Sequence, residues 1–111
     1  MANTKAMKYF NLYIGSAVNY YKIKKGWTNH DLSIQSNLSE SFIKQANTGL
    51  RHYNAYHLWN LARLIEVPIY KLYPPLSIDA KNFKQYKEIR PQATFDDFKN
   101  FVDLLSEYNN G

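Results

Sequence analysis

The chain has 111 residues, which is enough for one domain that buries a modest core without disulfides or metal ions. It contains no cysteine, which excludes disulfides and thiolate metal sites and is typical of proteins from a reducing cytosol. No run approaches the roughly 18–20 apolar residues of a membrane span. The first residues show no signal-peptide pattern, so we expect a cytoplasmic protein without a membrane partner.

Positive charge is concentrated in the first two thirds of the chain, although the formal net charge is only +5. Residues 1–75 carry nine Lys and Arg against three Asp and Glu, whereas residues 76–111 carry five against six. A basic segment suits a partner that carries phosphates. Many basic domains bind no nucleic acid, so the charge alone leaves the partner open.

The first helix is expected over residues 11–25. Residues 1–10 carry no secure pattern, and an apolar stripe at near-helical spacing begins only after them. Three lysines, Lys22, Lys24 and Lys25, lie in the last turn, where positive charge suits the helix dipole. Gly26 is a natural end for this helix.

The segment from Thr28 to Gly49 predicts two short helices separated by a tight turn. Thr28 and Asp31 have the spacing of a capping box at the start of the first of them, which should end near residue 36. Asn37 tolerates a left-handed backbone, and Ser39 can cap the next helix, which should run to about residue 47. Such a pair of helices can place its second helix in the major groove of DNA.

A fourth helix and a short fifth helix follow. Asn54 can cap a helix over residues 55–65, in which apolar residues recur with a strong helical period. Pro68 suits the first position of a helix over residues 69–73, and the double proline that follows ends it.

The last third of the chain predicts one or two further helices. Residues 76–93 are ambiguous, and Thr94 can cap a final helix with two acidic residues in its first turn. One face of that helix is apolar and must be buried. We expect this face to pair two copies of the chain, with folding back onto the same chain as the alternative. The face consists of Phe95, Phe98, Phe101, Val102, Leu105 and Tyr108.

Residues 14–73 share a series of marks with one known family. The marks are Ile14-Gly15 opening the first helix, the basic run 22–25, Thr28, Leu32, Leu38-Ser39, Ile43, Gly49, Leu58, Leu61-Ala62 and the ending Val67-Pro68-Ile69 with Leu72. In order and spacing they resemble the phage-repressor (Xre-type) helix-turn-helix family. The resemblance implies an all-α fold, with a five-helix DNA-binding domain over residues 9–75 and a helical C-terminal extension over residues 76–111.

Four positions depart from the pattern of that family. Asn29 stands where the family usually has a glutamine that touches phosphate, and Asn37 replaces the usual turn glycine. Ser36 replaces a core leucine, which loses apolar burial on the order of 1–3 kcal/mol. Asn47 replaces a glutamate near the end of the third helix.

The resemblance also implies which residues meet DNA. The exposed positions of the third helix would face base edges, and they are Ser39, Glu40, Ser41, Lys44 and Gln45. A lysine can donate to guanine and a glutamine can pair with adenine. Phosphate contacts would come from Asn29, His30, Thr48, Arg51, His52 and Tyr53. The alternative for both sets is a solvated polar surface.

The sequence therefore predicts a sequence-specific transcriptional regulator that binds double-stranded DNA as a homodimer, without a cofactor. The alternative is a protein-interaction module on the same scaffold, such as an antitoxin, an antirepressor or a phage-encoded inhibitor of a host defence protein, for example an anti-CRISPR. We expect no enzyme, because the chain has no HExxH motif, glycine-rich phosphate loop or arguable Ser-His-Asp set. We also expect no metal site, since His52 and His57 are separated by a loop.

Aromatic residues are abundant, with ten tyrosines, six phenylalanines and two tryptophans. Tyr20, Tyr21, Tyr56 and Trp59 are expected in the core or at its edge. If they were exposed instead, they would form a protein-binding patch.

Overall fold

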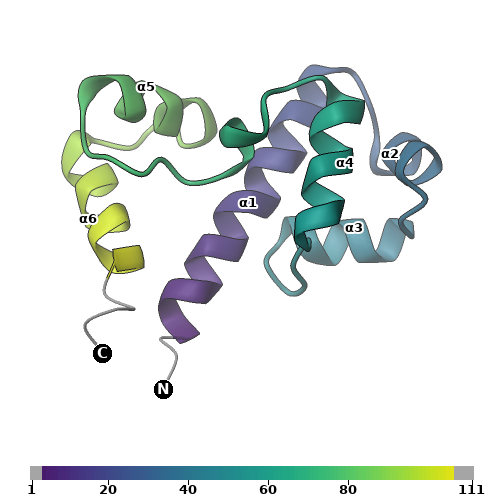
Figure 1. The fold of residues 1–111 in the computed structure, drawn as a ribbon, viewed down its shortest axis with the longest axis horizontal. Coiled ribbons are helices and arrows are strands. Elements are labelled where there is room, and N and C mark those ends of the chain that lie inside the picture. The colour runs from purple at the N-terminus through teal and green to yellow at the C-terminus, as the bar shows by residue number, and fades with distance from the viewer. Residues whose placement is uncertain (1–3, 107–111) are drawn as a thin grey trace.

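The computed structural model describes residues 4–106, which form helices and connecting turns without a strand (Figure 1). The predicted all-α class is therefore confirmed. In chain order the elements are α1 (Thr4–Lys24), α2 (Asn29–Ser36), α3 (Glu40–Asn47), α4 (Ala55–Ile65), the 3-10 helix η1 (Ile69–Leu72), α5 (Ala80–Ile89) and α6 (Phe95–Ser106).

Helix α1 is longer than expected, because it begins at Thr4 and not at residue 11. Its first half packs against side chains that lie far along the chain. The ring of Phe10 meets Tyr73 with centroids 6.1 Å apart, and the ring of Tyr13 meets Phe101 at 5.6 Å. A local pattern did not reveal this earlier start, because Phe10 and Tyr13 pack against residues that are distant in sequence.

Gly15 lies in the middle of α1, whereas the family marks placed it at the start of the helix. At this point α1 packs closely against α3. A Cβ atom on Gly15 would come within 2.1 Å of the carbonyl oxygen of Ala46. Only glycine allows this approach between the two backbones.

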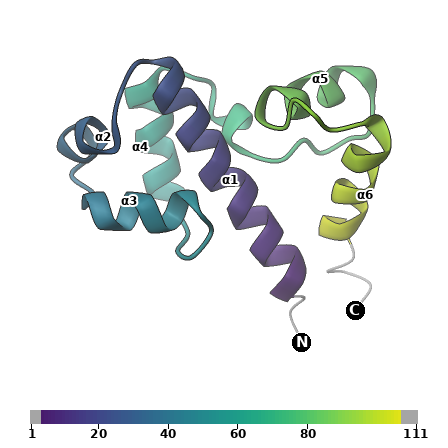
Figure 2. The same ribbon diagram turned by 180° about the vertical axis from the view of Figure 1, so that it is seen from behind.

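Helix α1 stands between two groups of helices. Figure 2 shows α2, α3 and α4 on one side of α1, with α5 and α6 on the other. A single cluster of buried residues nevertheless joins both sides. Its fully buried members include Tyr13, Val18, Leu32, Ile43, Leu61, Leu72 and Phe98.

The ambiguous segment 76–93 contains α5, which is capped by the side chain of Asp79. Phe98 of α6 is completely buried, with its ring 5.1 Å from that of Tyr86 and 5.8 Å from that of Phe83. The described part of the apolar face of α6 thus folds back onto the same chain, which was the alternative to pairing.

The members of that face differ in burial. Phe101 and Val102 are half-buried and pack against the core, Leu105 is half-buried, and Phe95 is 43% exposed. The remaining member, Tyr108, lies outside the described residues.

Candidate nucleic-acid interface

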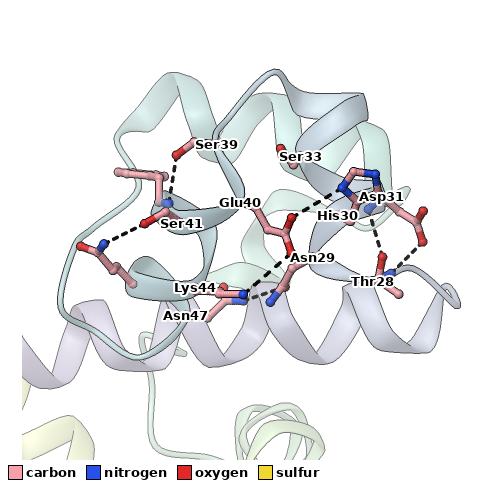
Figure 3. Close-up of polar contacts among 12 residues, drawn as sticks. Thr28, Asn29, His30, Asp31, Ser33, Ser39, Glu40, Ser41, Lys44 and Asn47 are labelled. Atoms are coloured by element: carbon pink, nitrogen blue, oxygen red, sulfur yellow. Dashed lines mark hydrogen bonds and ion pairs between the residues drawn. The ribbon is translucent and has the colours of Figure 1, made fainter.

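The start of α2 is held by a complete capping box, as its sequence predicts. The backbone N–H of Asp31 donates to Thr28 Oγ1 at 3.0 Å, and the backbone N–H of Thr28 donates to the Asp31 carboxylate at 2.9 Å (Figure 3). Hydrogen bonding of the carboxylate to the backbone N–H of Thr28, and then to its side chain, lowers the pKa of Asp31. The aspartate, although shorter than the usual glutamate, closes the box.

The turn between α2 and α3 is held by serine side chains. Asn37 adopts the left-handed backbone that the sequence predicts, with φ 64°, and its N–H donates to the Ser33 carbonyl at 2.9 Å. The Ser33 hydroxyl donates to the carbonyl oxygen of Leu38 at 2.6 Å. The N–H of Leu38 donates to Ser36 Oγ at 3.2 Å, so both backbone groups of one turn residue are satisfied.

Helix α3 has one buried face and one polar face. Ser39 caps it by accepting from the N–H of Phe42 at 3.0 Å, while Ile43 and Ala46 are buried beneath it. Figure 3 shows four of the predicted base-contacting residues along the helix and at its cap, namely Ser39, Glu40, Ser41 and Lys44. Ser39, Ser41 and Lys44 are exposed, and Glu40 and Gln45 are half-buried.

Side chains on the polar face interact with one another. Glu40 lies 3.9 Å from the Lys44 ammonium and 3.5 Å from His30 Nδ1. Gln45 donates to Ser41 Oγ at 3.1 Å. Because such exposed contacts contribute about 0–1 kcal/mol each, Lys44 and Gln45 can exchange them for contacts with a ligand.

The loop after α3 places most of the predicted phosphate contacts at the surface. Arg51 and His52 are exposed, and the Arg51 guanidinium lies 5.2 Å from the ring centre of Phe42. Thr48 is exposed, and its hydroxyl donates to the Gln45 carbonyl at 3.1 Å. At the start of α2, His30 is exposed as well, so these four side chains can be reached from solvent.

Tyr53 differs from the rest of the predicted phosphate-contacting set, because it is buried. Only 6% of its surface is exposed, and its ring packs against Phe42 with centroids 5.7 Å apart. Its hydroxyl donates to Asn47 Oδ1 at 3.0 Å, and burial raises its pKa. Tyr53 is therefore a core residue. The expectation that it lies at the DNA-facing surface is wrong.

Sequence reasoning missed Lys22, which is 4% exposed beneath the start of α2. Its ammonium group donates to Asn19 Oδ1 at 2.7 Å and to Asn29 Oδ1 at 2.6 Å. Burial lowers the pKa of Lys22. The spacing of four residues from Ile14 to Val18 to Lys22 was the available signal, since it continues a buried helical stripe.

Asn29, the sixth member of the phosphate-contacting set, is half-buried at the first position of α2. Its amide oxygen accepts from Lys22 and, at 3.5 Å, from Asn47 Nδ2. Figure 3 shows the Asn29 and Asn47 side chains between α2 and α3. The residue that replaces the usual glutamate of the family therefore joins the same polar cluster.

The basic surplus of residues 1–75 is not gathered on α3. Residues 28–53 contain only two basic side chains, Lys44 and Arg51, against two acidic ones. Lys25 pairs with Glu66 at 2.5 Å, on the ends of α1 and α4, so part of the positive charge is already matched elsewhere.

Two of the four aromatic residues expected in or near the core are exposed on α4. Tyr56 is 65% and Trp59 56% exposed, and their rings stack with centroids 6.2 Å apart. The Arg63 guanidinium lies 5.7 Å from the ring centre of Trp59. Tyr21 is buried and Tyr20 is half-buried, as expected.

Residues 4–106 show neither a metal-binding cluster nor a membrane-spanning helix. No three His, Asp or Glu side chains in this range lie close enough together to hold a metal ion. No helix in the range is both long and apolar enough to cross a bilayer. His57 has a structural role, because its Nδ1 accepts from the backbone N–H of Asn54 at 3.2 Å and completes the cap of α4.

No protein-family model, curated protein or solved structure matched this chain.

Proposed function

We propose that the protein is a sequence-specific DNA-binding transcriptional regulator that inserts α3 into the major groove of double-stranded DNA. One observation carries the proposal: two short capped helices meet at a tight turn, and the second presents a polar face to solvent. Ile43 and Ala46 anchor that helix in the core, which leaves Ser41 and Lys44 exposed on its outer side. A helix held in this way fits the groove of B-form DNA.

The side chains on α3 have complementary roles in this proposal. Lys44 donates to the acceptor atoms of guanine, and Gln45 makes a paired contact with adenine. Glu40 accepts from a cytosine amine, and its proximity to Lys44 and His30 offsets its negative charge near phosphates. The sugar-phosphate backbone is contacted by residues around the helix, which position the protein without reading sequence. These residues are Asn29, His30, Thr48, Arg51 and His52.

A mobility-shift titration with selected genomic fragments tests the proposal. The double variant Lys44→Ala with Gln45→Ala should weaken specific binding by at least about tenfold, since each good base contact discriminates by about 1–3 kcal/mol. Specific binding should also weaken steeply as salt rises. The matched control is Lys24→Ala, which removes an exposed lysine outside the helix-turn-helix unit and should change affinity far less.

Two results would contradict the proposal. One is the absence of any specific complex at moderate salt. The other is a double variant that is folded by circular dichroism and still binds the selected fragment as tightly as the wild type.

Pairing of two copies is part of the same proposal, because a two-fold dimer matches two half-sites about one DNA turn apart. The burial of Phe98 within the chain means that α6 does not need a partner to cover it. Light scattering of the free protein and of the DNA complex measures whether a dimer forms.

The second candidate function is a protein-interaction module on the same scaffold, for which the exposed Tyr56–Trp59 pair is the favourable observation. Aromatic residues and arginine are enriched at protein interfaces, and Arg63 lies against this pair. A pull-down that retains one stoichiometric protein and no DNA, and that Trp59→Ala abolishes, would favour this function over DNA binding.

A further inference from the structure

We infer that Lys22 is a positioning residue for the proposed DNA contact: it holds the side-chain amide of Asn29 so that the amide nitrogen is left to donate to a DNA phosphate. The inference rests on the proposed function and adds a residue that lies outside the expected contact set. Lys22 itself is too deeply buried to touch DNA, with 4% of its surface exposed.

The orientation of the Asn29 amide follows from the chemistry of its neighbour. An ammonium group has three donors and no acceptor, so the amide atom 2.6 Å from Lys22 Nζ must be the oxygen. The same argument orients Asn19, whose oxygen lies 2.7 Å from Lys22 Nζ. An asparagine in solution has no such constraint, because its amide can turn either end toward a phosphate.

A second chain of hydrogen bonds supports this orientation. Asn47 Nδ2 also donates to the oxygens of Asn29 and Asn19, at 3.5 and 3.4 Å. The opposite end of the Asn47 amide accepts from the Tyr53 hydroxyl at 3.0 Å. The cluster therefore joins α1, α2, the end of α3 and the loop after it.

The nitrogen of the Asn29 amide is left without a partner. No acceptor among residues 4–106 forms a hydrogen bond with Asn29 Nδ2, and the side chain is half-buried, not enclosed. Asn29 is the first residue of α2, one of the positions proposed to face phosphate. Its amide is thus held with a free donor before any ligand arrives, which reduces the ordering cost of the contact.

The charge of Lys22 is also unmatched locally. The ion pairs formed by residues 4–106 do not include Lys22, and burial alone accounts for its lowered pKa. Its acceptors are the neutral amides of Asn19 and Asn29. Among residues 4–106, no carboxylate therefore competes with the Asn29 oxygen for the Lys22 ammonium.

The test is a double-mutant cycle on the full chain, with affinity measured for the DNA fragment that the wild type selects. Lys22→Met and Asn29→Ala should each weaken binding by at least about tenfold, in line with a hydrogen bond to a charged group. The double variant should bind no more weakly than Asn29→Ala alone, because Lys22 acts through Asn29. The matched control, Lys24→Met, removes one exposed lysine of the same helix and should change affinity less than twofold.

The wild type supplies a second measurement that does not depend on the folding of Lys22→Met. The side-chain amide signals of Asn29 in a nitrogen-proton NMR spectrum should shift when the selected fragment is added. Lys22→Met removes the ammonium group from a buried side chain, and a thermal melt checks that this variant folds.

The outcomes separate the two proposals. If the wild type selects no DNA, the proposed function fails and this inference fails with it. If the wild type binds DNA but Lys22→Met behaves like Lys24→Met, or the losses from Lys22→Met and Asn29→Ala are additive, only the inference is overturned. Unchanged Asn29 signals on DNA binding would overturn it as well.

Discussion

Ser36 shows how a single residue can replace a missing core contact with a different interaction. A leucine is usual at this position in the family that the sequence resembles, and its loss suggested a weakened core. The structure shows Ser36 Oγ accepting from the N–H of Leu38, while the Ser33 hydroxyl donates to the carbonyl of the same residue. Hydrogen bonds to the backbone thus hold a turn that apolar packing would otherwise hold.

Tyr13 gives a prediction at the same scale. Its side chain is completely buried, and its hydroxyl has no hydrogen-bond partner among residues 4–106. Tyr13→Phe should therefore raise the free energy of unfolding by about 1 kcal/mol, because a buried unsatisfied polar group is removed. A thermal melt would show this as an increase of roughly 4–8 °C in the midpoint.

The matched control for this change is Tyr53→Phe. The Tyr53 side chain is also buried, but its hydroxyl donates to Asn47, so removal of this hydroxyl should lower the free energy of unfolding by about 1–2 kcal/mol. If Tyr13→Phe and Tyr53→Phe changed the free energy of unfolding equally, the hydrogen bond of the Tyr53 hydroxyl would not explain its contribution to stability.

At the level of elements, the contact between α1 and α3 sets the position of the candidate DNA-reading helix. Gly15 allows the two helices to approach until a Cβ would overlap the carbonyl oxygen of Ala46. Ala46 lies on the buried side of α3, opposite the exposed Lys44. The lack of a side chain at Gly15 therefore determines how closely α3 packs against α1.

Gly15→Ala should destabilise the protein, although alanine is the better helix former by about 1 kcal/mol. The clash is with a backbone atom that cannot rotate away, so we expect a net loss of about 1–3 kcal/mol or more. Urea unfolding measures this loss. Lys8→Ala, on an exposed position of the same helix, is the control and should change stability by less than about 0.5 kcal/mol. A Gly15→Ala variant as stable as the wild type would contradict this packing.

At the level of the whole molecule, the C-terminal helices are part of the core that supports the helix-turn-helix unit. Tyr13 of α1 stacks on Tyr86 of α5 with centroids 5.8 Å apart and also meets Phe101 of α6. The same buried cluster continues through Val18 and Leu32 toward α2. A destabilising substitution in α6 should therefore also destabilise the segment proposed to bind DNA.

Phe98→Ala tests this continuity. Removal of a fully buried phenylalanine should cost about 3–5 kcal/mol, and the protein should still unfold in one transition, because both sides of α1 share a core. The control is Phe95→Ala on the same helix, where the ring is 43% exposed and the loss should be less than half as large. Two separate transitions, or similar losses for both variants, would indicate that α6 is not integrated in this way.

Much of the helix-turn-helix unit could be predicted because its determinants are local. Thr28, Ser39 and Asn54 each cap the helix that follows, and each side chain accepts from a backbone N–H three residues later. The left-handed Asn37 and the exposed positions of α3 follow from the same short-range pattern. The local pattern did not reveal that Tyr53 and Lys22 are buried.

The sequence by itself determined the all-helical class, the caps and the turn, because these depend on interactions between residues three or four positions apart. Only the tertiary structure decided that α1 begins at Thr4, that α6 folds back, and that Lys22 is buried against Asn29. The first two depend on contacts between residues far apart along the chain, which a local pattern does not record. The third joins residues seven positions apart across the turn between α1 and α2.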